Sequence, residues 1–142
     1  MQIILPANYG GNGRYLGVRA LNDTGSSIMT LYYHEATQLG WQPALFPAQL
    51  DQISSPDGVS LREVIHVFAR VCDYNGYPLT DWFVEKVVLR TFTGAETRLS
   101  GSTVRNHLYF GTAPRLQNLY VARNKTQLSR ILPNFNRLPP HR

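Results

Sequence analysis

The sequence predicts a mainly β fold, and three patterns support that prediction. Apolar residues alternate with others over positions 64–72, a period of two that is typical of a strand with one buried face. Asn75-Gly76 follows, a pair that favours the positive φ angles of a tight hairpin turn. Further apolar runs flank this hairpin, and each is as long as an ordinary strand. These runs cover residues 15–21, 28–33, 82–89 and 119–122.

Helical patterns are short and occur in two places, roughly 103–109 and 126–132. Thr126 is the expected N-cap of the second helix, because its hydroxyl can accept a hydrogen bond from a backbone amide of the first turn. At 142 residues the chain is long enough for one domain with a substantial core. We therefore expect one domain over residues 1–133, followed by a flexible, basic, Pro-containing tail over residues 134–142.

Composition excludes several classes of protein. Hydrophobic residues make up 43% of the chain, yet no apolar run approaches the ~18 residues that a membrane span requires. The N-terminal residues lack the pattern of a signal peptide, so we expect an intracellular, cytoplasmic protein with no membrane partner. Cys72 is the single cysteine and cannot form an internal disulfide, and the four histidines show no metal-ligand spacing. The sequence therefore predicts no cofactor and no metal.

The net charge of +5 is unevenly distributed along the chain. Glu96 is the last acidic residue, and eight Arg or Lys residues follow it. Clustered cations bind nucleic acid because they displace counterions from phosphate. These eight are spaced singly, however, which is more typical of a solvated surface. Nucleic-acid binding is therefore the less favoured interpretation.

The most informative segment is residues 20–27, Ala-Leu-Asn-Asp-Thr-Gly-Ser-Ser, which leads directly into an apolar run. It resembles the active-site motif of aspartic proteases, in which a water held between two carboxylates attacks the peptide carbonyl. In that motif Asp23 supplies a carboxylate, Thr24 bonds across a two-fold axis, and Gly25 permits a tight turn. Asp-Thr-Gly is also a common turn sequence, so a purely structural turn is the alternative.

The proposed chemistry needs two carboxylates, and this chain carries one motif. None of its four other aspartates precedes Thr-Gly or Ser-Gly, and the chain is too short for a two-lobed enzyme that repeats the motif. A second copy is therefore expected to supply the second Asp23, since closed two-fold symmetry is the commonest arrangement of homo-oligomers. This arrangement is similar to that of the retropepsins, the aspartic proteases of retroviral and retrotransposon type.

The resemblance implies a fold, an activity and a partner. The fold is mainly β and closed-barrel-like, with a flap hairpin and one or two short helices. The activity is that of an endopeptidase, and the partners are a second copy of the chain and a peptide or polyprotein substrate.

The resemblance also assigns parts outside the motif, in the same order from Met1 to Tyr109. Ser26 and Ser27 are expected at the substrate, and the Ser26 hydroxyl can donate to the Asp23 carboxylate and lower its pKa. Residues 2–5 resemble the outer strand of the dimer interface, and residues 99–101 with the helix from Arg105 resemble elements that brace the catalytic loop. The expected tip of the flap, which closes on the substrate, consists of Pro56, Asp57, Gly58 and Val59.

Three features depart from the viral pattern. Ser100 replaces an apolar residue of the bracing turn, Ser27 replaces an aspartate found in many viral enzymes, and about thirty residues follow Tyr109. The extension after Tyr109 resembles those of retrotransposon-derived or cellular domains of the family. Two alternatives stay open: a non-catalytic dimerisation module with the same fold, and a basic β-domain that binds nucleic acid.

Overall fold

The structure is a computed structural model, and it describes residues 1–22, 25–94, 98–113 and 117–133. The chain divides into two compact units, Met1–Thr103 and Val104–Arg142, and each is described by itself below. The described part is mainly β, as the sequence predicts. A single domain over residues 1–133 stays a prediction, and the proposed tail over residues 134–142 lies outside the described residues.

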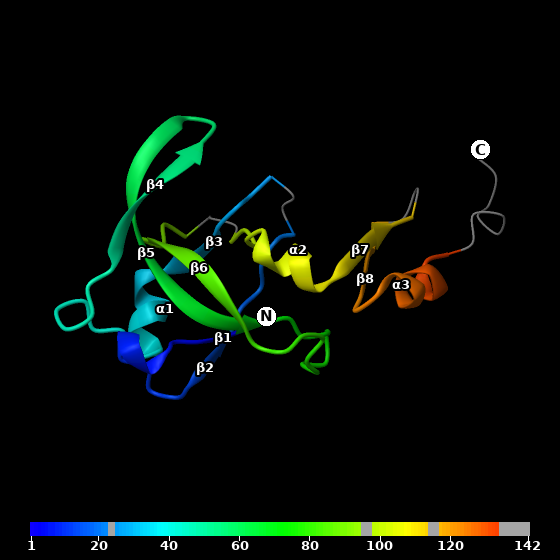
Figure 1. Cartoon of the computed structure of the whole chain (residues 1–142), viewed down its shortest axis with the longest axis horizontal. Coiled ribbons are helices and arrows are strands. Elements are labelled where there is room, and N and C mark those ends of the chain that lie inside the picture. The colour runs from blue at the N-terminus through cyan, green and yellow to red at the C-terminus, as the bar shows by residue number, and fades with distance from the viewer. Residues whose placement is uncertain (23–24, 95–97, 114–116, 134–142) are drawn as a thin grey trace. The chain divides into compact units, whose positions relative to one another are not determined.

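The first unit is built on one sheet, whose pairing order is β2-β1-β5-β6-β3, with β4 also paired to β5 (Figure 1). Every pair is antiparallel except β3 with β6, which is parallel. Because β5 is 13 residues long, it pairs with β4 near its start and with β1 near its end. The strands are β1 (Gln2–Ile4), β2 (Tyr15–Gly17), β3 (Met29–Tyr32), β4 (Gln49–Ser55), β5 (Gly58–Arg70) and β6 (Phe83–Arg90).

The closed barrel that the resemblance implies is not found among the described strands. β2 and β3 stand at the two ends of the pairing order, and no described pairing joins them. The predicted strand over residues 15–21 ends at Gly17, after which Leu21 forms only an isolated bridge with Leu99. β1 lies between β2 and β5, so both its edges are paired within the chain, unlike an outer interface strand.

The core lies on one face of this sheet and includes side chains from the segment after β3. The period of two predicted for β5 is confirmed, because Ile65, Val67 and Ala69 are fully buried. Burial of such apolar side chains is the main source of folding free energy. The largest buried cluster consists of Ile3, Leu5, Val18, Met29, Leu31, Ala36, Leu39, Trp41, Ile65, Val67, Val87 and Leu89.

A short helix that the sequence analysis did not predict, α1 (Tyr33–Gln38), follows β3 directly. The Glu35 carboxylate accepts a hydrogen bond from the Tyr32 amide at 3.1 Å, which satisfies a donor at the helix start. The helix stops before Gly40, whose φ of 104° favours glycine and whose Cβ, if present, would lie 2.5 Å from the Gly10 carbonyl oxygen. An additional short 3-10 helix covers Ala7–Tyr9.

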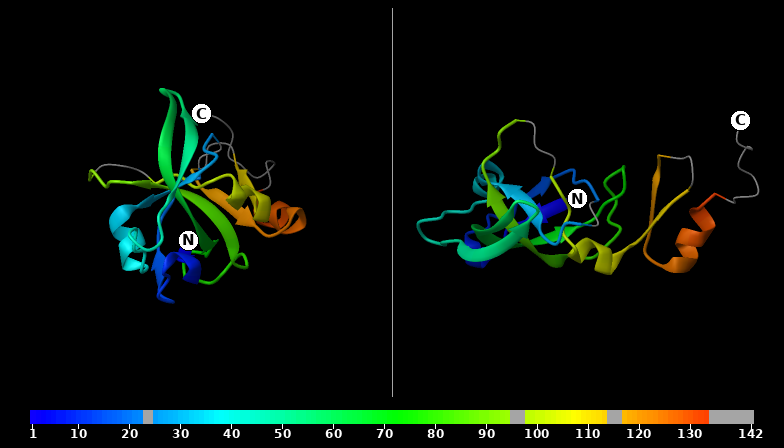
Figure 2. Two further views of the ribbon diagram at one scale, coloured as in Figure 1. Left: turned by 60° about the vertical axis from the view of Figure 1, so that its left-hand side comes forward. Right: turned by 90° about the horizontal axis from the view of Figure 1, so that it is seen from above.

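β4 and β5 form a hairpin at the residues predicted as the flap, and it projects from the rest of the sheet (Figures 1 and 2); we keep the name flap for this hairpin. Ser55 pairs with Gly58, so Pro56 and Asp57 form a two-residue turn. Gly58 has a φ of 119°, a conformation that side chains rarely adopt. The predicted turn at residues 75–76 is also confirmed, between β5 and β6, with a φ of 86° at Gly76.

The second unit contains a hairpin of β7 (Tyr109–Thr112) and β8 (Leu119–Ala122), followed by α3 (Lys125–Ile131). The helix α2 (Thr103–His107) spans the boundary between the units. The predicted N-cap Thr126 is wrong, because Asn124 accepts the capping bond from the Gln127 amide at 2.9 Å. None of the helices in the described ranges is long and apolar enough to cross a membrane.

Candidate functional site

Two of the predicted catalytic residues, Asp23 and Thr24, lie outside the described residues. The third, Gly25, is exposed. Of the predicted substrate-binding residues that follow, Ser26 is half-buried and Ser27 is exposed. The site is therefore built from the described residues on either side of Asp23 and Thr24. We call residues 21–27 the Asp23 loop.

A turn formed by residues 98–102 binds both ends of the Asp23 loop. Before the aspartate, the Leu21 amide donates to the Arg98 carbonyl at 2.8 Å, and the Ser100 amide donates to the Leu21 carbonyl at 2.9 Å. After it, the Ser27 carbonyl accepts from the Ser102 hydroxyl at 3.2 Å and from the Ser102 amide at 3.5 Å. This turn lies where the sequence analysis expected a brace, and it holds the loop by its backbone.

The Arg98 side chain ties together three further segments around the loop. Its Nε donates to the Thr30 carbonyl at 3.1 Å, and its Nη1 donates to the Arg19 carbonyl at 3.2 Å. Its Nη2 forms an ion pair with Glu35, and the two side chains are only 9% and 13% exposed. Since Asp23 lies between residues 19 and 30, Arg98 fixes the chain on both sides of the motif. The sequence analysis missed Arg98, because no local pattern distinguishes it from a surface arginine.

Within the loop, the Ser26 hydroxyl donates to the carbonyl of Ile28 at 2.8 Å. The expected bond to Asp23 stays a prediction, because that carboxylate lies outside the described residues.

The four residues predicted at the flap tip, Pro56 to Val59, are all exposed. Period-two alternation puts Val59 and Leu61 on one face of the hairpin, and Leu50 from β4 shares that face through its pairing with Glu63. These three apolar side chains are between 63% and 68% exposed. A hairpin face of this kind can cover an extended apolar segment of a ligand.

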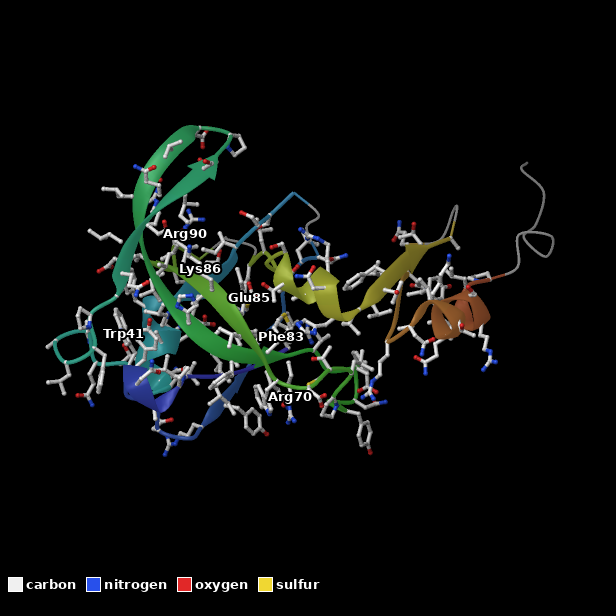
Figure 3. The ribbon with its side chains drawn as sticks, viewed as in Figure 1. Trp41, Arg70, Phe83, Glu85, Lys86 and Arg90 are labelled. Atoms are coloured by element: carbon white, nitrogen blue, oxygen red, sulfur yellow. The ribbon has the colours of Figure 1, made fainter. Side chains whose placement is uncertain are left out.

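The base of the flap is anchored at two points. The Tyr33 hydroxyl donates to the Glu63 carboxylate, and this bond raises the pKa of Tyr33 to about 12. Lys86, labelled on β6 in Figure 3, forms an ion pair with Asp51 and lowers the pKa of that carboxyl. One anchor therefore joins β5 to α1, and the other joins β4 to β6.

Glu85, the neighbour of Lys86 on β6, is a buried carboxyl close to this site (Figure 3). It is 1% exposed, and its Oε2 has no hydrogen-bond partner. Burial raises the pKa of Glu85 to about 7, against a smaller opposing effect of a hydrogen bond with Thr103. The sequence analysis missed Glu85, although the alternation of Phe83, Glu85 and Val87 already places it on the buried face.

Across the described residues, no group of three or more His, Cys, Asp or Glu side chains is arranged to hold a metal ion. No protein-family model matches the chain, and comparisons with curated proteins and with solved structures also found no match. Function is therefore inferred from the motif and from the geometry around it.

Proposed function

We propose that the chain is an aspartic endopeptidase of the retropepsin type, acting as a homodimer in which each copy supplies one Asp23 carboxylate. One observation carries this proposal: the loop that contains Asp-Thr-Gly is bonded at both ends by the 98–102 turn. A carboxylate that activates water must be held close to its productive geometry by its surroundings.

The two Asp23 carboxylates share one proton, because two adjacent carboxylates cannot both ionise easily. The ionised carboxylate takes a proton from the attacking water, and the protonated one donates a proton during attack on the peptide carbonyl. Gly25 keeps the loop free of a side chain beside the aspartate, and Thr24 joins the two loops across the dimer axis. No cofactor is required.

The apolar face of the flap favours, as the substrate, an extended peptide with apolar side chains. One face of the hairpin is apolar and exposed, and it consists of Leu50, Val59 and Leu61. The tip is a two-residue turn at Pro56 and Asp57, and we expect the end of the hairpin to move toward a bound peptide. Closure of such a hairpin excludes water from the reacting groups. Ser26 and Ser27, which follow the motif, would lie beside the bound peptide.

Replacement of Asp23 tests the proposal directly. Asp23→Asn is nearly isosteric, so the dimer should fold while cleavage falls by at least about 10²-fold, the usual contribution of acid–base catalysis. The measurement is digestion of a peptide library from about pH 3 to pH 7, with and without a statine-type transition-state analogue. The matched control is Asp81→Asn, since Asp81 is exposed and outside the proposed site.

Retained cleavage by purified Asp23→Asn would end the aspartic-protease proposal. A wild-type dimer that cleaves no peptide in the library would instead favour the non-catalytic dimerisation module.

A further inference from the structure

Glu85 is a buried carboxyl that the proposed mechanism does not use. A Cβ added at Gly101 would lie 2.2 Å from Glu85 Oε1 and 3.1 Å from the Met29 amide nitrogen. The carboxyl therefore occupies the space that a side chain at position 101 would need. Glu85 thus lies where β6, the first residue of β3 and the 98–102 turn meet.

Among the described residues, no cation lowers the pKa of Glu85, and Arg98 of the adjacent turn is paired with Glu35 instead. The partner of Glu85 on β5 is Val67, and its carboxyl forms a hydrogen bond with Thr103. The nearest basic groups along the sheet, His66 and Lys86, pair with each other in register on the opposite face. A buried carboxylate without a cation is strongly disfavoured, so the neutral acid is the stable form and the pKa rises to about 7.

The turn against which Glu85 packs is the same turn that holds the Asp23 loop. Gly101 lies between Ser100 and Ser102, whose amides bond Leu21 and Ser27 at the two ends of the loop. Two polar atoms nearby, Ser100 Oγ and Asn22 Oδ1, are buried without hydrogen-bond partners, so these two side chains do not help to fix the turn or the loop by hydrogen bonds. Any movement of the turn is therefore transmitted to both ends of the loop.

We propose that Glu85 is a positioning residue for the Asp23 loop, and that it supports the 98–102 turn as the neutral carboxylic acid. Ionisation places an unpaired charge against Gly101, and the turn shifts to let water reach it. The loop then loses its alignment, so activity declines as the pH rises through neutrality. The effect on catalysis rests on the proposed protease function, whereas the link between Glu85 and the loop does not.

The structural link is tested by NMR, without reference to activity. Amide signals of Leu21, Ser100 and Ser102 are followed from about pH 5 to pH 9 in the wild type and in Asp23→Asn, where the catalytic carboxylates no longer titrate. We expect the three signals to shift together with a midpoint near pH 7 in both proteins. Addition of Glu85→Gln, which mimics the neutral acid, should abolish the shift. Signals that do not move, or that still move with Gln at position 85, would overturn the proposal.

The catalytic consequence is tested by kcat/KM against pH. Glu85→Gln should move the basic limb of the profile to higher pH by at least about one unit, while Asp81→Asn leaves it in place. A merely structural role for Glu85 would lower activity at every pH and leave the limb where it is, and that result would overturn the positioning role. If the wild type shows no proteolysis, the proposed function fails, and the NMR titration of the wild type decides the role of Glu85.

Discussion

At the scale of single residues, Gly101 illustrates how closely the turn and the buried acid fit each other. Its φ is not in the left-handed region, so its need for glycine is steric. Gly101→Ala would place a methyl group 2.2 Å from Glu85 Oε1, and this carboxyl is enclosed by the core. We expect a loss of about 1–3 kcal/mol in the free energy of unfolding, the usual cost of overpacking, measured by urea denaturation.

Gly17→Ala is the matched control for this substitution. A Cβ at Gly17 meets no atom within 4 Å, and this residue also avoids the left-handed region. The free energy of unfolding should therefore change by less than about 0.5 kcal/mol. Equal effects of the two substitutions would show that the contact between Gly101 and Glu85 is not tight.

At the scale of elements, the flap depends on its anchors at the base. Tyr33→Phe removes the hydrogen bond to Glu63, the contact that ties β5 to α1. We expect a loss of about 1–2 kcal/mol in the free energy of unfolding, since this bond involves a charged acceptor. The flap should also become more mobile, seen as lower NMR order parameters over residues 50–61, with a higher KM for peptide substrates.

Glu63→Gln provides the comparison for the Tyr33 anchor, because it keeps a hydrogen-bond acceptor but removes the charge. Its effect on flap mobility should be smaller than that of Tyr33→Phe. Order parameters that are unchanged in Tyr33→Phe would mean that the flap is anchored by Asp51 and Lys86 alone.

Elements with a strong local pattern were predictable from the sequence. The strand β5 follows from alternation, the turn at residues 75–76 from its turn residues and the strand Leu119–Ala122 from a short apolar run, all of which act over a few positions. The flap hairpin, in contrast, is implied by the resemblance to retropepsins. The helix α1 was not predictable from a local pattern, because the apolar run of the preceding strand continues into its first residue. The helix also has only six residues, too few for a clear helical pattern. Asn124 and Thr126 both have side chains that can cap a helix, and only the backbone conformation identifies Asn124 as the N-cap.

The parts of the site that escaped prediction depend on distant contacts. Arg98 bonds Thr30 and Glu35, which are 68 and 63 positions away, and no spacing rule connects such residues. Glu85 is different, because the alternation of side chains along β6 places it on the same buried face as Phe83 and Val87. A glutamate in the buried phase of an apolar strand was therefore a readable signal for a titratable group in the core.

At the scale of the whole molecule, the proposed site is complete only in a dimer. Specific activity should therefore fall on dilution and vanish where the monomer predominates. Activity is measured over a range of protein concentrations, with the oligomeric state followed by analytical ultracentrifugation. An active monomer would contradict the proposal, since it would require a second carboxylate within the chain.

Mixing experiments sharpen this prediction. Excess Asp23→Asn should inhibit the wild type, because mixed dimers contain one Asp23 carboxylate. An excess of the Asp81→Asn variant should not inhibit the wild type, because its mixed dimers keep both Asp23 carboxylates.

Global stability should also depend on pH through Glu85. The pKa of this carboxyl rises from an ordinary value of 4.5 to about 7 in the folded chain, so the folded state keeps its proton over a range where the unfolded state has lost it. Raising the pH through this range therefore favours the unfolded state, by up to about 1.4 kcal/mol for each pH unit. The stabilisation is fully present below about pH 4.5 and is lost as the pH rises through about 7, with a total of about 3 kcal/mol.

Glu85→Gln removes this titration from both states. The free energy of unfolding of the variant, measured by urea denaturation from about pH 4 to pH 8, should exceed that of the wild type increasingly as the pH rises, and the difference should level off above about pH 7. Asp51, whose pKa is lowered by Lys86, acts in the opposite direction and at lower pH, so its contribution is lost on acidification and cancels in the comparison. A difference between the two proteins that is constant over the whole range would mean that Glu85 keeps an ordinary pKa in the folded chain, and that water reaches its carboxyl.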